Sequence, residues 1–168
     1  MSSSTSEVIV FTDGSTINNG SPDALGSSAV LFPNGEIKGG FFYINDNLVR
    51  TNNRMEYYAA IMAMELMNEF DPTNQTVLHI YSDSMLLINT CEKWMEGWEK
   101  KGWPERIKNK DLVKRLYKLC HMRKIKWTHV KSHQKDNSFE TKWNNLVDKC
   151  ANSSVHGDDI SNVKINIS

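Results

Sequence analysis

Apolar and polar residues follow two periods along this chain, and these periods predict strands and helices in turn. Short β-rich or alternating runs predict strands at residues 8–12, 27–32, 36–43, 77–82 and 125–130. The turn signal Pro33-Asn34-Gly35 joins the second strand to the third, so the first three strands are expected to form an antiparallel meander. The uninterrupted apolar runs at 8–12 and 77–82 are typical of buried strands, which are often parallel neighbours.

Helical spacing of apolar side chains predicts the segments between the strands, as in the shared face of Met55, Ala59, Met62 and Leu66. The predicted helices cover residues 54–69, 84–92, 94–98, 111–122 and 143–153. This order predicts an α/β fold with a mixed five-stranded sheet, three antiparallel strands then two parallel, flanked by helices. One domain is expected over residues 7–156, after a disordered lead (1–6). A polar tail (157–168) follows, in which Val163, Ile165 and Ile167 alternate like a weak strand.

Composition narrows the class of protein only slightly. The 168 residues include 20 basic and 20 acidic side chains, so no global charge points to nucleic acid or membrane. Basic residues nevertheless cluster between residues 93 and 131, and local clustering can steer a polyanion. Three widely spaced cysteines indicate reduced thiols rather than a disulfide framework or a zinc site. No apolar stretch predicts a signal peptide or a membrane span, so an intracellular location, in the cytoplasm or nucleus, is expected.

Two of the predicted strands end in the same way. Each apolar run stops at a hydroxyl residue that an aspartate follows, Thr12-Asp13 in one and Ser82-Asp83 in the other. If these strands are neighbours, both aspartates lie at the carboxyl edge of the sheet, where open α/β folds build their sites. Carboxylates held together repel unless protons or a cation compensate them, so a metal site is indicated. Taken singly, each aspartate could also be a turn residue after a strand.

Two further acids lie near the starts of predicted helices. Glu56 could complete a capping box with Asn53 as the N-cap, and Asp148 could be an acid of a first helical turn. Neither structural role needs any chemistry. Convergence of all four acids on one sheet edge would favour a shared metal site over four unrelated roles.

Several motifs, in this order along the chain, resemble the type 1 ribonucleases H. They are Thr12-Asp13-Gly14-Ser15, Thr51-Asn52-Asn53-Arg54-Met55-Glu56, Ser82-Asp83-Ser84-Met85, Val130-Lys131-Ser132-His133 and the late Asp148. The resemblance covers residues 7–155 and includes a basic-aromatic insert at 94–103, similar to the eukaryotic members. It implies an endoribonuclease that hydrolyses the RNA strand of RNA/DNA hybrids. It further implies that Asp13, Glu56, Asp83 and Asp148 bind two Mg²⁺ ions, for which Mn²⁺ can substitute.

The resemblance also implies a mechanism. Two ions about 3.5–4 Å apart hold the attacking water and the leaving 3′-oxygen, with Asp13 bridging both ions. The products carry a 5′-phosphate and a 3′-hydroxyl, and no covalent enzyme intermediate forms. His133 assists proton transfer or product release and is expected to tune the rate. From the residues alone, a surface histidine in a mobile loop is an equal alternative. A loop at residues 134–142 is expected to separate His133 from the last helix.

Contacts with both strands of a hybrid are implied as well. Short amides can recognise 2′-hydroxyls in the shallow minor groove, and tryptophans with flanking lysines can follow a DNA backbone, with salt weakening the binding. Thr51 and Asn109 match the family's phosphate pocket. The expected substrate-binding residues are Asn19, Thr51, Asn52, Asn53, Met85, Trp94, Trp98, Lys100, Lys101 and Asn109. Each group also has a purely structural alternative. Asn19 could belong to a turn, and Asn52 and Asn53 could cap a helix. The two tryptophans could belong to the core, and the lysines could lie on a solvated helix face.

Two other functions remain open from the sequence. A related metal-dependent nuclease or resolvase could share the sheet, and a non-enzymatic module could bind hybrids without cleaving them. The Asn-Asn-Arg-Met-Glu segment and the tryptophan insert argue against the resolvase. The presence of all four acids argues against the binding module. The expected partner is an RNA/DNA hybrid duplex, with no membrane, and the expected state is a monomer.

Overall fold

A computed structural model describes residues 6–18, 22–44, 48 and 50–155, and the side chains of the last helix as far as residue 152. Asn19 and the weak strand predicted at 163–167 lie outside the described residues. None of the described helices combines the length and the apolar character that crossing a membrane requires.

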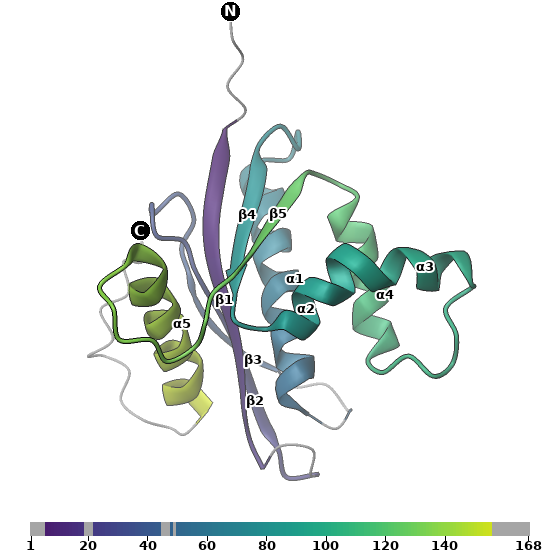
Figure 1. The fold of residues 1–168 in the computed structure, drawn as a ribbon, viewed down its shortest axis with the longest axis horizontal. Helices are drawn as coiled ribbons and strands as arrows, with labels where there is room; N and C mark the ends of the chain where they lie inside the picture. The colour runs from purple at the N-terminus through teal and green to yellow at the C-terminus, as the bar shows by residue number, and fades with distance from the viewer. Residues whose placement is uncertain (1–5, 19–21, 45–47, 49, 156–168) are drawn as a thin grey trace, which may run out of the picture.

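Five strands form one mixed sheet in the order β3-β2-β1-β4-β5 (Figure 1). The strands are β1 (Glu7–Ile17), β2 (Leu25–Leu31), β3 (Gly40–Ile44), β4 (Val77–Ser82) and β5 (Ile125–His129). β2 pairs antiparallel with β1 and β3, whereas β4 pairs parallel with β1 and β5. The predicted five-stranded sheet, its meander and its parallel pair are confirmed.

The predicted end of the first strand at residue 12 is wrong. The parallel pairing of β1 with β4 ends at Phe11 opposite Tyr81, but β1 continues to Ile17 because β2 pairs with it as far as Leu25. Asp13 therefore lies within β1, at the point where β4 no longer accompanies it. The third strand also starts later than predicted, since its pairing with β2 begins only at Gly40.

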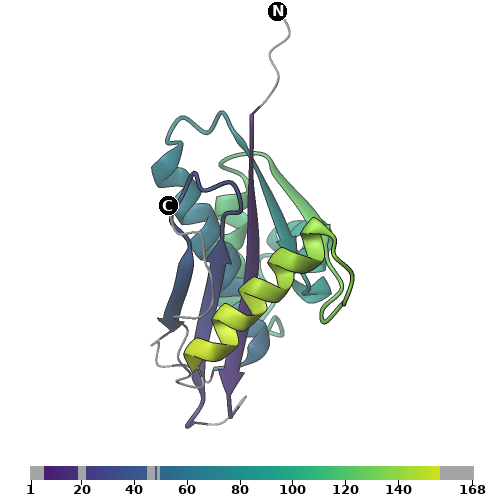
Figure 2. The same ribbon diagram turned by 90° about the vertical axis from the view of Figure 1, so that its left-hand side faces the viewer.

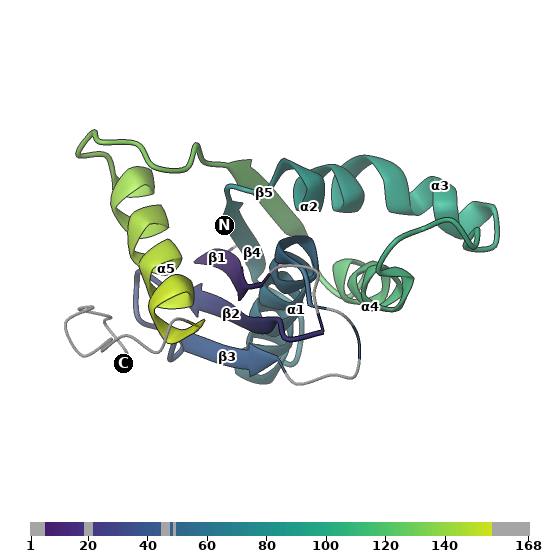
Figure 3. The same ribbon diagram turned by 90° about the horizontal axis from the view of Figure 1, so that it is seen from below.

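Helices cover both faces of the sheet. They are α1 (Asn52–Phe70), α2 (Met85–Asn89), the π-helical turn η1 (Thr90–Trp94), α3 (Met95–Lys100), α4 (Lys110–Cys120) and α5 (Phe139–Val155). α1 and α4 lie on one side of the sheet and α5 crosses the other (Figures 2 and 3). Each interface has its own apolar core, with Ile80 and Met64 buried on the α1 side and Phe11 and Val147 on the α5 side.

The two short helices predicted at 84–92 and 94–98 are one continuous helical run that contains the π-helical turn η1. Thr90 is fully buried, its hydroxyl donates to the Leu86 carbonyl at 2.7 Å, and it lies 3.0 Å from the Tyr57 hydroxyl. A side chain bonded into the helical ladder is a common cause of such irregular turns. α3 then projects away from the sheet, on the side opposite α5 (Figure 3).

The N-cap of α1 is not the one that the structural alternative for Glu56 required. Thr51, not Asn53, caps the helix, because its hydroxyl accepts the Arg54 backbone N–H at 3.1 Å. The far end of α1 is held by Arg123, which donates to the backbone carbonyls of Met67, Asp71 and Thr76. With both ends fixed, α1 presents its first turn to the sheet edge in one orientation.

Candidate active site

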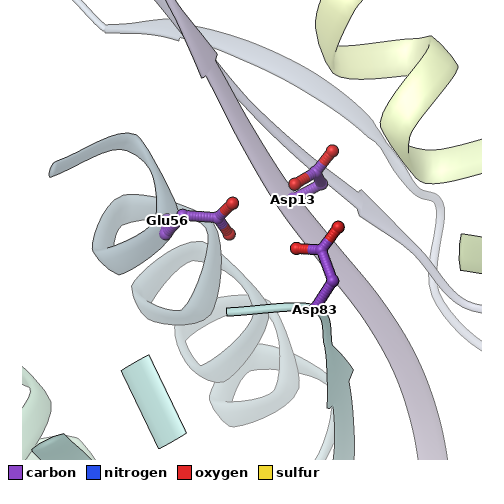
Figure 4. A group of neighbouring side chains, drawn as sticks. All are labelled: Asp13, Glu56 and Asp83. Carbon is purple, nitrogen blue, oxygen red and sulfur yellow. The ribbon is translucent and has the colours of Figure 1, made fainter. Parts of the chain in front are cut away.

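Three carboxylates from separate elements point toward one another at the edge of the sheet (Figure 4). Asp13 comes from β1, Glu56 from the first turns of α1, and Asp83 from the residue after β4. One oxygen of each lies within 4.8 Å of the others. Asp13 is only 4% exposed and Glu56 9%. Glu56 therefore reaches across to β1 and does not form the capping box with Asn53 that was its structural alternative.

A glycine makes this approach of α1 to β1 possible. A Cβ atom at Gly14 would lie 2.5 Å from the backbone nitrogen of Glu56, well inside van der Waals contact. The absence of a side chain at Gly14 therefore lets two backbones touch beside the acids. The Gly14 backbone N–H lies close enough to the Glu56 carboxylate to lower the pKa of that acid, against the stronger effect of burial. The small residue after Asp13 thus sets the distance between the two elements that carry Asp13 and Glu56.

The buried acids are costly to ionise together. Burial raises the pKa of Asp13 well above its usual value, and the charges of Glu56 and Asp83 raise it further. Burial raises the pKa of Glu56 to about 8, although a hydrogen bond with Asp13 opposes this. Glu56 Oε2 has no hydrogen-bond partner among the described residues. Such a cluster needs protons or a cation, and its all-oxygen donors suit a hard divalent ion.

The fourth predicted acid, Asp148, belongs to α5 and lines the same surface depression as Asp13, Glu56 and Asp83. It is not in a first helical turn, as its structural alternative required, because α5 begins at Phe139, four residues before the predicted start. The expected 134–142 loop is accordingly shorter. Burial is the main cause of the raised pKa of both Asp13 and Asp83, and Asp148 lies close enough to raise both further.

We call this open depression, about 330 Å³ in volume, the acid cleft. The predicted site residues that line it are Asp13, Asn52, Glu56, Asp83, His133 and Asp148. His133 adopts a left-handed backbone conformation with φ of 57° and is exposed. Its charge lowers the pKa of Asp83, against the stronger effect of burial. Met85, at the start of α2, is 43% exposed beside Asp83.

A second depression, also about 330 Å³, lies on the other side of the α1 N-terminus. We call it the basic cleft, and its polar and aromatic lining includes Asn53, Trp98, Arg106, Lys108 and Asn109. Asn52 and Asn53 are consecutive, yet one lines the acid cleft and the other the basic cleft. The first turn of α1 is therefore the ridge between the two.

The structure does not bring Thr51 into the basic cleft with Asn109. Arg54 connects them instead: its backbone N–H donates to Thr51, and its guanidinium donates to Asn109 Oδ1 at 3.2 Å and to Asp111 at 2.6 Å. Arg54 is 2% exposed, whereas the side chain of its partner Asp111 is 52% exposed, so the pairing reaches the surface. The motif contained Arg54, but no local signal indicated its partners on α4.

The remaining predicted residues lie along the projecting helical arm. The rings of Trp94 and Trp98 are 6.0 Å apart, and Trp94 is 39% exposed. Lys100 and Lys101, at the end of α3, are exposed. Trp98 also lines the basic cleft, and α3 lies on the side of the molecule far from α5 (Figure 1).

Fold and site together define a class of protein: an α/β protein with a mixed sheet, at whose edge a group of carboxylates is suited to bind divalent cations. A family model described as RNase H matches residues 5–156. A ribonuclease H of Acetivibrio thermocellus is 34% identical over 154 residues, which cover 89% of this chain and 95% of that protein. The chain therefore belongs to the ribonuclease H family, a family of hydrolases that generally depend on divalent metal ions.

Solved structures share the fold at lower sequence identity. LC9-RNase H1, a type 1 RNase H with the type 2 active-site motif, gives a TM-score of 0.74 at 19% identity, covering 100% of this chain and 80% of that one. A foamy viral protease-reverse transcriptase in complex with an RNA/DNA hybrid gives 0.69 at 16% identity, covering 89% of this chain and 20% of that one. Both likenesses support the fold alone.

Proposed function

We propose that this chain is an endoribonuclease that hydrolyses the RNA strand of RNA/DNA hybrids. The single observation that carries the proposal is the convergence of Asp13, Glu56, Asp83 and Asp148 on one open cleft. Membership of the ribonuclease H family agrees with it. The catalytic domain is the stretch 7–156, acting as a monomer.

Asp13, Glu56, Asp83 and Asp148 would hold two Mg²⁺ ions, or Mn²⁺ in their place. The donor set fits, because every ligand is an oxygen and Glu56 Oε2 is buried without a partner among the described residues. When bound, such ions activate a water and stabilise the leaving oxygen, which yields 5′-phosphate and 3′-hydroxyl products. Asp13 lies close enough to Glu56, Asp83 and Asp148 for all three to raise its pKa, after burial, which supports the proposal that Asp13 would help to hold both ions.

His133 would move protons near the acids. It is exposed, lines the acid cleft and sits close enough for its charge to act on Asp83. An imidazole can accept and release a proton near neutral pH, so it suits the transfer that accompanies cleavage or product release. Its place on a loop at the rim, outside the carboxylate nest, supports a role in tuning the rate.

The two clefts offer a physical basis for selecting an RNA/DNA hybrid over duplexes of RNA alone or DNA alone. We assign the RNA strand to the acid cleft and the DNA strand to the basic cleft, with the amides of Asn52 and Asn53 between them in the minor groove. The other proposed contacts are Asn19 and Met85 with the groove, Thr51 and Asn109 with a DNA phosphate, and Trp94, Trp98, Lys100 and Lys101 with the DNA backbone. A foamy viral protein of this fold was solved with an RNA/DNA hybrid. The arm resembles the eukaryotic basic-aromatic insert.

A magnesium-dependent cleavage assay on a matched hybrid, RNA duplex and DNA duplex tests the proposal. The wild-type protein should cut only the RNA of the hybrid, and Asp13→Asn should abolish turnover while hybrid affinity is retained. Asp23→Asn is the matched control, because Asp23 is exposed and outside both clefts. Cleavage of the DNA duplex would favour the resolvase, and tight hybrid binding without cleavage would favour the binding module. Near-normal turnover by Asp13→Asn would refute the bridging role.

A further inference from the structure

One face of α5 carries a row of three polar side chains toward the acids. Asn144, Asp148 and Asn152 are spaced i, i+4 and i+8, so they lie above one another on the helix. Asn144 is 1% exposed, although amides are seldom buried so deeply without a reason. The acid therefore lies between two amides on successive turns.

Each amide interacts with a different carboxylate of the acid cleft. Asn144 lies beside Asp83, where its polar interaction opposes the rise that burial causes in the pKa of that acid, and its Oδ1 has no hydrogen-bond partner among the described residues. Asn152 Nδ2 donates to Asp148 Oδ1 at 3.1 Å and to the Asp148 backbone carbonyl at 3.1 Å. α5 thus contributes one carboxylate, Asp148, to the acid cleft and places an amide beside a second, Asp83, which follows β4.

Asn152 is itself anchored to the strand that carries Asp13. The Ser15 hydroxyl donates to Asn152 Oδ1 at 2.6 Å, and Ser15 is 6% exposed in β1. The Asp148 carboxylate and carbonyl oxygens can only accept, so Asn152 must turn Nδ2 toward Asp148, which leaves Oδ1 to accept the Ser15 hydroxyl. Ser15, Asn152 and Asp148 form a chain of hydrogen bonds from β1 into the acid cleft.

We propose that Asn144 and Asn152 are positioning residues that set the affinity of the acid cleft for divalent cations. Resting on the proposed function, this inference concerns the orientation of Asp83 and Asp148, not their presence. A carboxylate without its amide donor can rotate about χ1 and χ2 and must be reordered when an ion binds. Loss of a partner that orients a ligand typically weakens metal affinity about 10–100-fold.

The test compares Asn144→Ala, Asn152→Ala and Ser15→Ala with Asn145→Ala. Asn145 is the matched control, since it is the next amide on α5 but is exposed and donates to the Gln134 backbone carbonyl at 3.3 Å. Titration calorimetry with Mg²⁺ in the absence of hybrid measures affinity directly. Hybrid cleavage at increasing Mg²⁺ gives the concentration for half-maximal rate and the rate at saturation.

We expect Mg²⁺ affinity to fall 10–100-fold in Asn152→Ala and Asn144→Ala, and by a smaller factor in Ser15→Ala. The rate at saturating Mg²⁺ should recover to within a few-fold of wild type, which a merely unfolded or misfolded protein cannot do. Asn145→Ala should match wild type. Ser15→Ala keeps the test decisive if Asn144→Ala does not fold.

Two failures can be told apart. If wild-type protein cuts hybrids and binds Mg²⁺ but folded Asn152→Ala does so with unchanged affinity, the positioning inference is overturned and the proposed function stands. If wild-type protein neither binds Mg²⁺ nor cuts hybrids, the proposed function fails, and this inference fails with it.

Discussion

Substituting Gly14 by alanine tests how strictly the contact between β1 and α1 sets the site. The added Cβ would lie 2.5 Å from the Glu56 backbone nitrogen, whereas ordinary contact begins at 3.4 Å. The obstacle is backbone of the first turns of α1, which Thr51 caps and Arg54 ties to α4, so no flexible side chain can move aside. The strand and the helix must therefore separate by about 1 Å.

Two effects of different size follow from this separation. Overpacking a close contact costs about 1–3 kcal/mol, and about 2–4 °C of Tm per kcal/mol is usual for a protein of this length. A shift of about 1 Å in a catalytic group can cost roughly a hundredfold in rate. We therefore expect Gly14→Ala to remain folded, to melt several degrees lower and to cut hybrids roughly a hundredfold more slowly at saturating Mg²⁺.

Gly26→Ala is the control for this reasoning. Its Cβ would also meet a neighbour too closely, but that neighbour is the Met55 thioether, a flexible group that can repack. Thermal melts and single-turnover cleavage at saturating Mg²⁺ separate stability from chemistry. If Gly14→Ala melts and cleaves like wild type, or no worse than Gly26→Ala, the view that a bare backbone contact sets the spacing of Asp13 and Glu56 is wrong.

Three further outcomes follow from the same structure. His133→Ala should lower the single-turnover rate by roughly a hundredfold or less without abolishing it; complete inactivity would give the imidazole a central role, and an unchanged rate would give it none. Since burial raises the pKa of Glu56 from 4.5 to about 8, the folded protein binds the extra proton, so metal-free stability should fall as pH rises across that interval. Calorimetric melts should show Mg²⁺ restoring Tm at the alkaline end and Glu56→Gln flattening the dependence, and a metal-free Tm that climbs with pH instead would contradict this sign. Arg123→Ala removes the donors to three backbone carbonyls between the last turn of α1 and the start of β4, and should lower the free energy of unfolding by about 3 kcal/mol or more in urea denaturation; a loss under 1 kcal/mol would be incompatible with that bonding.

Local patterning was enough to predict the five strands, the meander and the two aspartates that follow buried strands, whereas the role of Glu56 came from the resemblance to the family. β-rich runs that end at Asp13 and Asp83 needed only one assumption, that the two strands are neighbours. The end of β1 could not be predicted in this way, because residues 13–17 remain in a strand only through pairing with β2. The π-helical turn depends similarly on Thr90, whose bond to Leu86 competes with the regular ladder.

The contacts around the site that the motifs did not predict are those between residues far apart in the sequence. Ser15 and Asn152 are 137 positions apart and Arg54 and Asp111 are 57 apart, so neither pair has a local signature. Thr51 and Asn53 illustrate the converse problem. Both are good capping residues, and only the path of the preceding chain decides between them.

The buried guanidinium of Arg54 has a mechanical consequence for how a long substrate would be processed. It braces the start of α1, two residues from Glu56, against Asn109 and Asp111 of the neighbouring helix. The distance between the phosphate that is cut and the contact with the opposite strand would then be fixed. RNA fragments cut from a hybrid with a blunt end should therefore share one shortest length, measured from that end. This length should not depend on the base sequence.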